Sequence, residues 1–283
     1  MGDMQVLDST MHWREAGRGD PIVLLHGNPT SSFLWRNVIP RLQDDGRCLA
    51  PDLIGMGRSG KPAIDYSFAD HARYLDAWFD RLELHRVTLV IHDWGSALGF
   101  HWARRHPERV AGIAFMEGIV RPLRWHEWPE ASRELFRAFR TPGVGEKLIF
   151  EKNVFVERVL PGSILRTLTD EEMNAYREPF RDPPSRRPVW RWPNQIPLDG
   201  EPADVVEIVD AYARWLRESD VPKLLLTFDP GILIQAPMVE WCRNNIRSLE
   251  IRHIGPGSHF VQEDHPEAIG DAVKDWRRRV LAT

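Results

Sequence analysis

Short apolar runs alternate with longer helical patterns over residues 1–120 of the chain. The apolar runs have the length of buried strands, and they cover residues 22–25, 47–50, 87–91 and 110–116. Between them, helical length and spacing predict helices at residues 35–42, 68–82 and 96–105. Strands that alternate with helices are typical of a mainly parallel sheet with helices on both faces, so we expect an α/β fold.

The alternation stops after Val120 and resumes near residue 204. Residues 121–203 contain helical segments without clear strands, including a capping-box pattern at Thr169 and Glu172. Their second half is rich in proline, which predicts a stiff return loop instead of long regular elements. Beyond it we expect helices at 204–218, 236–244 and 266–280 and strands at 224–228 and 249–254. This organisation predicts an α/β core from residues 1–120 and 204–283, interrupted by a helical cap at 121–203.

The composition suits a globular protein with a sizeable core and argues against several kinds of partner. The 283 residues are 42% hydrophobic, and a formal net charge of -4 offers no basic surface for nucleic acid. Cys48 and Cys242 are isolated, so neither a disulfide framework nor a metal site is indicated. Residues 1–20 lack the apolar run of a signal peptide, and no stretch approaches the ~20 apolar residues of a membrane span. We therefore expect a cytoplasmic protein that does not bind membranes.

Asp93 stands at a sharp turn between an apolar strand and a helix of small residues. In α/β-hydrolases with the G-x-S-x-G pattern, this turn exposes a nucleophilic serine beside backbone N–H groups. A carboxylate here is already ionised near neutral pH and needs no base to activate it. It suits displacement of a leaving group from an sp3 carbon, which forms an ester on the protein. Hydrolysis of that ester calls for a histidine. The alternative is that Asp93 only caps the following helix.

Residues that follow other predicted strands are the natural partners of Asp93, because ligands bind at the carboxyl ends of the strands in open α/β sheets. Glu117 follows the strand at 110–116, and His259 lies in a loop after the last strand. The order nucleophile, acid, histidine matches that of an α/β-hydrolase triad. Asp229, directly after the strand at 224–228, is a competing acid that we rank second. His26 follows the first strand and is better interpreted as a brace of its turn.

Taken together, these motifs resemble the haloalkane dehalogenases, within them the branch with an Asp-His-Glu triad. The resemblance runs nearly end to end, and its motifs lie at residues 26–36, 51–57, 92–96, 176–180 and 262–264. It implies the α/β-hydrolase fold with an inserted cap. It also implies Asp93 as nucleophile, His259 as base and Glu117 as the acid that orients the base. Asn28 and Trp94 would stabilise the departing halide, and Pro193 would lie near it.

The chemistry implied by this resemblance fits these residue types. Carbon–halogen cleavage builds negative charge on the halide, and the Asn28 amide and Trp94 indole supply two neutral N–H donors. A neutral alkyl halide binds largely by desolvation, so the cap should enclose an apolar cavity. By resemblance its lining would include Trp128, Phe136, Phe139, Phe155, Leu233 and Phe260. We expect a small halogenated aliphatic substrate, water as second substrate, halide as product, no cofactor and no metal, in a monomer or weak homo-oligomer.

Two other enzymes share much of this framework. An epoxide hydrolase would use the same Asp93 and His259 but needs acidic donors, for which Tyr176 and Tyr212 are the candidates. A coelenterazine-type luciferase is the second alternative, on a near-identical scaffold. A ligand receptor without catalysis is disfavoured, because every triad position carries a competent residue.

Overall fold

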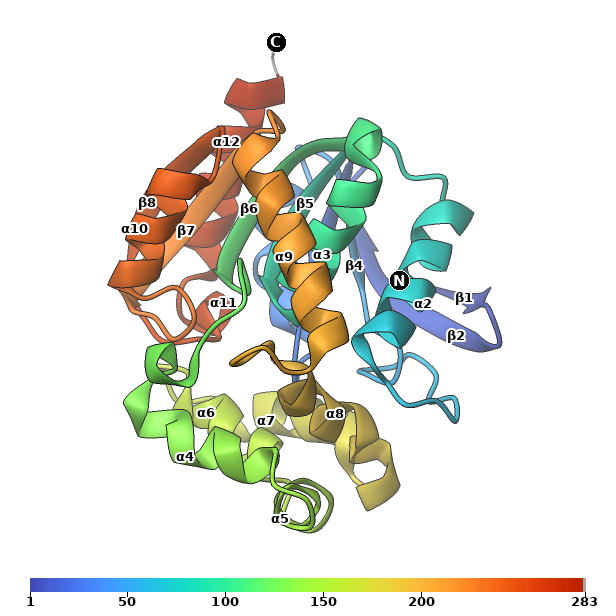
Figure 1. The fold of residues 1–283 in the computed structure, drawn as a ribbon. Coiled ribbons are helices and arrows are strands. Elements are labelled where there is room, and N and C mark those ends of the chain that lie inside the picture. Colours follow the sequence, from blue (N-terminus) through green and yellow to red (C-terminus); the bar gives the residue numbers. More distant parts are fainter. Residues whose placement is uncertain (282–283) are drawn as a thin grey trace.

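An eight-stranded, mainly parallel sheet forms the centre of the computed structural model, which describes residues 1–281 (Figure 1). The strand order is β1-β2-β4-β3-β5-β6-β7-β8. β1 and β2 form an antiparallel hairpin, β2 pairs antiparallel with β4, and the other neighbours are parallel. The strands are β1 (Gly2–Val6), β2 (Ser9–Ala16), β3 (Pro21–Leu25), β4 (Arg47–Pro51), β5 (Val87–Asp93), β6 (Val110–Gly118), β7 (Lys223–Pro230) and β8 (Leu249–Gly257).

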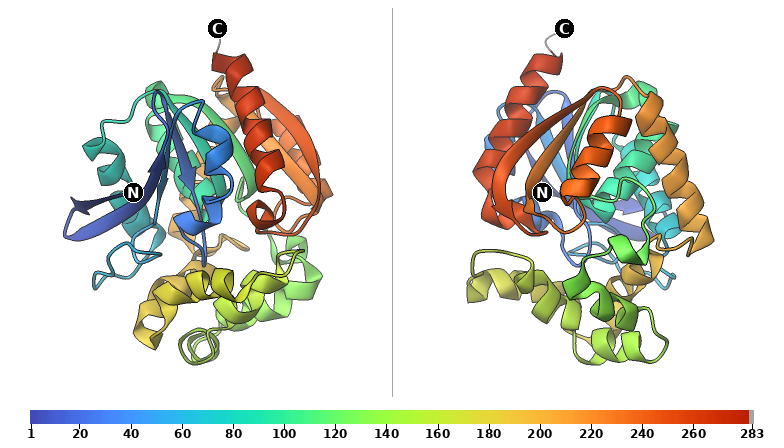
Figure 2. Two further views of the ribbon diagram at one scale, coloured as in Figure 1. Left: turned by 180° about the vertical axis from the view of Figure 1, so that it is seen from behind. Right: turned by 60° about the vertical axis from the view of Figure 1, so that its left-hand side comes forward.

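Both faces of the sheet are buried under helices, and successive side chains of a strand point to opposite faces. In β3, Ile22 and Leu24 belong to one apolar cluster, and Val23 and Leu25 belong to the other. Helices α1 (Ile39–Leu42) and α12 (Pro266–Leu281) cover the first face (Figure 2). The second face is covered by α2 (Phe68–Arg81), α3 (Trp94–Arg105), α9 (Ala203–Glu218) and α10 (Ala236–Asn245). The predicted α/β fold is thereby confirmed.

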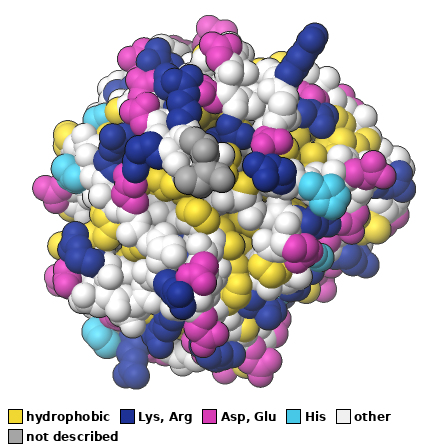
Figure 3. All heavy atoms as spheres, turned by 90° about the horizontal axis from the view of Figure 1, so that it is seen from above, with side chains coloured by type: hydrophobic (Ala, Val, Ile, Leu, Met, Phe, Trp, Pro, Cys, Tyr) yellow, Lys and Arg dark blue, Asp and Glu magenta, His cyan; other side chains and the backbone are white. Residues whose placement is uncertain are grey.

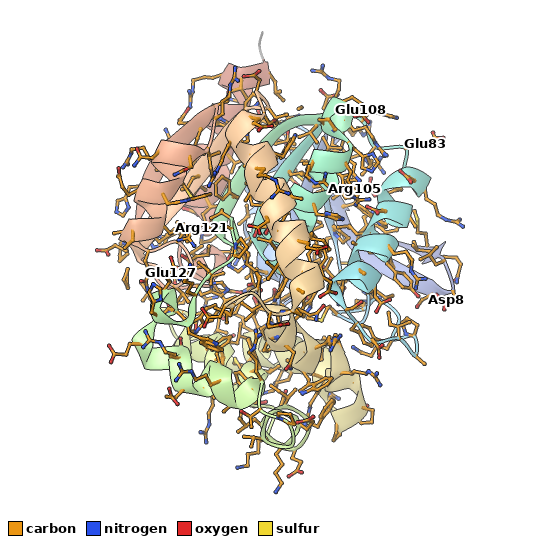
Figure 4. All side chains as sticks on the ribbon, in the orientation of Figure 1. Asp8, Glu83, Arg105, Glu108, Arg121 and Glu127 are labelled. Carbon is orange, nitrogen blue, oxygen red and sulfur yellow. The ribbon has the colours of Figure 1, made fainter. Side chains whose placement is uncertain are left out.

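A group of short helices lies across the end of the sheet at which β5 and β6 finish (Figure 1). They come between β6 and α9 in the chain, and the ion pair of Arg121 with Glu127 fixes the start of this segment (Figure 4). The helices are η3 (Trp125–Glu127), α4 (Glu130–Phe139), α5 (Val144–Glu146), η4 (Lys147–Glu151), η5 (Phe155–Val159), α6 (Leu160–Gly162), α7 (Asp170–Arg177), η6 (Glu178–Phe180), η7 (Pro183–Arg186) and α8 (Arg187–Gln195). We call this group the cap; its bounds at 121 and 203 stay a prediction.

Four salient differences separate the predicted elements from the observed ones. The hairpin β1–β2 was not predicted, because β1 alternates half-buried with exposed positions and lacks an apolar run. The helix expected at 35–42 is split into η1 (Ser32–Trp35) and α1, since Pro40 lies in the first turn of α1 and lacks the N–H of an interior position. Two short helices were also missed, η2 (Pro107–Arg109) and α11 (Val261–Asp264).

The proline-rich return segment also forms more helix than expected. Pro183 and Pro188 lie in the first turns of η7 and α8, where a backbone N–H would have no partner within the helix. Pro193 lies inside α8. The capping box at Thr169 is confirmed, because its side chain accepts the Glu172 N–H at 3.2 Å while the Glu172 carboxylate accepts the Thr169 N–H.

The charge of the surface and the character of the helices relate to the predicted lack of nucleic-acid and membrane binding. At the end opposite the cap, basic and acidic side chains lie intermixed (Figure 3). No helix within residues 1–281 has both the length and the apolar character needed to cross a membrane. A cytoplasmic location and the lack of nucleic-acid binding stay predictions.

Candidate active site

Asp93 occupies the strained turn between β5 and α3. Its backbone has φ 48° and ψ -128°, and its side chain makes no capping hydrogen bond with α3, so the helix-cap interpretation is wrong. Such a conformation in a residue other than glycine costs on the order of 1–3 kcal/mol and persists only where surrounding structure enforces it. Ser96 provides such support, because its Oγ donates to the Asp93 carbonyl oxygen at 2.5 Å and accepts the Ile119 N–H at 2.8 Å.

The loop after β3 holds the Asp93 carboxylate. The backbone N–H of Asn28 donates to Asp93 Oδ2 at 2.8 Å. A side chain at Gly27 would overlap the same oxygen, so the backbone can approach only because this residue is glycine. His26 braces the turn as expected. Its Nδ1–H donates to the Gly27 carbonyl at 2.9 Å, and its Nε2 accepts the Leu53 N–H at 2.9 Å.

Glu117 orients His259 toward Asp93. The carboxylate of Glu117 is 1% exposed and can only accept hydrogen bonds, so the 3.0 Å contact with His259 Nδ1 assigns a hydrogen to that nitrogen. His259 Nε2 then faces Asp93, with 3.7 Å between Nε2 and Oδ1. The structure therefore brings together the three side chains expected to form the triad.

The loop after β7 also binds the Glu117 carboxylate, although it contributes no acid itself. Oε2 accepts the N–H groups of Ile232 and Leu233 at 2.9 Å each, and Oε1 accepts that of Ile234 at 3.2 Å. At Gly231, which has φ +66°, a Cβ atom would lie 2.7 Å from Glu117 Oε1. Asp229 is exposed and makes no ion pair with His259, so the competing assignment of the acid is wrong.

The two carboxylates of the triad stabilise a protonated His259, and the charge of His259 stabilises the carboxylate of Asp93. Burial lowers the pKa of His259, but the two carboxylates of Asp93 and Glu117 outweigh it and raise the pKa to about 9. Burial raises the pKa of Asp93, yet the interaction with protonated His259 at 3.7 Å outweighs it and holds the pKa below the ordinary value. At neutral pH, Asp93 is therefore an anion facing an imidazolium.

Two supports of His259 were missed by sequence reasoning. His92, the residue before Asp93, donates from Nε2 to the His259 carbonyl oxygen at 2.8 Å, and burial lowers the pKa of His92 to about 3. From the cap, the Ser163 carbonyl accepts the N–H groups of His259 and Phe260 at 3.1 Å each. A histidine beside the turn residue was the available signal for the first support. The second depends on how the cap folds back and has no signal in the sequence.

A cavity of about 180 Å³ opens onto Asp93 between core and cap. Its walls are mainly apolar, and five of the six predicted lining residues contribute to them: Trp128, Phe136, Phe155, Leu233 and Phe260. Phe139 does not line it. That ring packs behind the wall, 5.5 Å from Phe136 and 5.3 Å from Phe155 between centroids. The remaining lining residues are Asn28, Asp93, Trp94, Ile119, Leu123, Ser132, Leu135, Arg158, Val159, Gly162, Ser163, Pro193, Ile196, Ile232 and His259.

Two neutral N–H donors face the cavity beside Asp93. The Trp94 indole N–H makes no hydrogen bond within residues 1–281, and its ring is held by a stack on Trp192 with centroids 4.4 Å apart. Asn28 Nδ2 donates one hydrogen to the Val189 carbonyl at 3.3 Å and keeps the other. That carbonyl is free because its usual partner in α8 would be the N–H of residue 193, which proline lacks. The arrangement can bind an anion without placing a counter-charge beside it.

The hydroxyls that an epoxide-opening reaction would need are engaged elsewhere. Tyr176 donates to the Glu263 carboxylate, and Tyr212 donates to the Ile119 carbonyl at 2.6 Å. Neither tyrosine lines the cavity. Within the described part of the chain, no three His, Cys, Asp or Glu side chains are arranged to hold a metal ion.

Comparisons with known proteins show which family this chain is similar to. The family model of the alpha/beta hydrolase fold matches residues 20–266. The chain is 54% identical to a haloalkane dehalogenase of Mesorhizobium japonicum over 98% of this chain and 90% of that protein. It is 50% identical to one of Sphingobium indicum over 98% and 95% of the two chains. The crystal structure of a haloalkane dehalogenase from Bradyrhizobium elkani superposes with a TM-score of 0.97 at 49% identity, covering 99% of this chain and 98% of the other.

Proposed function

This chain belongs to the haloalkane dehalogenases of the α/β-hydrolase fold, and we propose that it cleaves carbon–halogen bonds through a covalent ester on Asp93. The protein is a hydrolase of haloalkanes. The observation that carries the proposed mechanism is the position of an ionised Asp93 between two sets of groups, the N–H donors of Asn28 and Trp94 on one side and His259 on the other.

In the first proposed step, a carboxylate oxygen of Asp93 attacks the carbon that bears the halogen. The new carbon–oxygen bond forms as the carbon–halogen bond breaks, and the bonding pair leaves with the halide. The Asn28 amide and the Trp94 indole donate hydrogen bonds to the developing anion. Because both donors are held by contacts that precede the reaction, they need little reorganisation as charge develops.

In the second proposed step, His259 Nε2 takes a proton from water while that water attacks the ester carbonyl carbon of Asp93. The backbone N–H of Asn28, which already donates to Asp93 Oδ2, is placed to stabilise the oxyanion together with the Trp94 N–H at the start of α3. Glu117 stabilises the imidazolium that forms. Collapse of the intermediate releases a primary alcohol from a primary haloalkane and restores the Asp93 carboxylate, with halide and a proton as the other products.

Esterification of Asp93 is expected to lower the pKa of His259, so that the imidazole can act as a base in the second step. In the resting protein, the carboxylates hold His259 protonated below pH about 9, and an imidazolium cannot accept a proton. Alkylation removes the charge of Asp93, so the pKa of His259 must fall. We predict that Asp93→Asn, which also removes this charge, lowers the pKa of His259 by about one pH unit or more. NMR titration of the imidazole, with the mass checked for an intact amide, measures it. A pKa that stays at about 9 would contradict the coupling.

Pro193 is proposed to act through the carbonyl that it leaves free. Alanine at this position would supply an N–H to the Val189 carbonyl and compete with Asn28 Nδ2. We expect Pro193→Ala to weaken competitive inhibition by bromide about 3- to 10-fold, the loss of roughly one hydrogen bond. Pro188→Ala, in the first turn of the same helix, is the control and should leave inhibition unchanged. Equal inhibition constants in wild type and Pro193→Ala would mean that the Val189 carbonyl has no role in halide binding.

The apolar walls support small halogenated aliphatic compounds as substrates, bound largely by removal of apolar surface from water. The test is bromide release from 1-bromobutane and 1,2-dibromoethane, beside diol formation from styrene oxide and light emission with coelenterazine. We expect bromide alone. Diol or light without bromide would refute the proposed reaction. The monomeric or weakly associated state stays a prediction.

A further inference from the structure

Arg158 of η5 stands at the open end of the cavity. Most of the lining residues are buried, Asp93 among them at 7% exposure, whereas Arg158 and Gly162 are exposed and mark the opening. Ser132 and Ser163, both half-buried, lie on the same rim. The cavity therefore runs from a closed end with the nucleophile and the halide donors to an opening that Arg158 lines.

The guanidinium of Arg158 is free to bind a ligand. Within residues 1–281 it makes neither a hydrogen bond nor an ion pair, and the adjacent carboxylate of Glu157 pairs with Arg177 at 2.8 Å. Arg166 of the cap lacks this freedom, since Glu172 and Glu263 bind its guanidinium. Arg158 is also the one arginine or lysine among the residues that line the cavity. The protein as a whole carries a net charge of -4, so it offers no general attraction for an anion.

We propose that Arg158 makes this protein prefer haloalkanes that end in a carboxylate, the ω-halocarboxylates. The apolar walls would hold the alkyl chain, the halogen would lie at Asn28 and Trp94, and the carboxylate at the other end would pair with Arg158. Arginine suits this position because its planar fork binds a carboxylate through two parallel hydrogen bonds. The inference rests on the proposed function, since it places the reacting carbon at Asp93.

The test compares 6-bromohexanoate with its methyl ester, which has the same reacting carbon and chain but no charge. The ratio of kcat/KM for the acid to that for the ester should fall about 3- to 10-fold in Arg158→Gln, a modest effect because the pair is exposed to solvent. It should fall further in Arg158→Glu, which repels the acid. The change should lie in KM, and the wild-type ratio should fall at high ionic strength. Arg181→Gln, an exposed cap arginine paired with Glu178 and outside the lining, is the control and should leave the ratio unchanged.

The outcomes separate this inference from the function beneath it. Turnover of the ester with an unchanged ratio in both Arg158 variants would overturn the inference and leave the dehalogenase mechanism intact. An equal loss for acid and ester would overturn it too, because it would assign Arg158 to structure or to halide exit. Wild-type turnover of the ester without turnover of the acid would also overturn the inference and leave the dehalogenase mechanism intact. Failure to release bromide from the ester and from 1-bromohexane alike would instead refute the proposed function.

Discussion

Replacement of His259 by phenylalanine is expected to stop the reaction after one alkylation. Asp93 needs no base for its attack, so the variant should release about one bromide per protein molecule. The ester should then persist, because loss of a general base slows hydrolysis by roughly 10²–10⁴-fold. Rapid-quench measurement of bromide, with intact-mass analysis of the protein, detects both the burst and the added alkyl group.

His253→Phe is the matched control for this variant, since His253 is an exposed residue of β8 away from the cavity. It should turn over 1-bromobutane at the wild-type rate and accumulate no adduct. Steady turnover by His259→Phe without an adduct would mean that another group activates the water.

Asp93→Ala is expected to abolish both steps. Without the carboxylate no ester can form, so neither a bromide burst nor an adduct should appear, and steady release should fall by about 10⁴-fold or more. The fold should survive, because alanine also relieves the buried charge. Bromide release from 1-bromobutane by the purified variant, with circular dichroism to verify folding, measures the effect.

Asp229→Ala is the control for Asp93→Ala and tests the discarded acid at the same time. Asp229 is exposed at the end of β7 and does not contact His259, so its removal should change turnover less than about twofold. A large loss there, with retained activity in Glu117→Ala, would reverse the assignment of the acid.

The fold could be predicted where burial imposes a pattern on the chain. β3 to β7 are buried for most of their length, so each appears as a run of apolar residues, whereas β8 at the sheet edge is mostly half-buried. The predicted bounds of all six strands lie close to the observed ones. The hairpin β1–β2 lies at the sheet edge, where β1 alternates with exposed positions and leaves no run. The sequence does not predict α8, because proline breaks the interior of a helix, whereas Pro188 occupies a first turn that needs no N–H.

The site could be predicted as far as strand ends determine it. Asp93 and Glu117 end neighbouring parallel strands, so a sheet brings them to the same edge. The cap offers no comparable rule. Phe136 lines the cavity and Phe139 packs behind it, yet both are apolar residues of α4. Arg158 and Ser163 acquire their positions only through the folding of η5 and α6 over the core, which no local pattern reports.

A single turnover in 18O-labelled water, with protein in excess over 1-bromobutane, tests the ester on Asp93 most directly. If water attacks the carbonyl carbon of the ester, the first butanol formed carries an unlabelled oxygen from Asp93, and the label enters the Asp93 carboxylate. Mass analysis of the alcohol and of the peptide that contains Asp93 should find this distribution. Butanol that carries the label from the first turnover, with an unlabelled Asp93, would mean that water displaces the halide directly and would contradict the covalent mechanism.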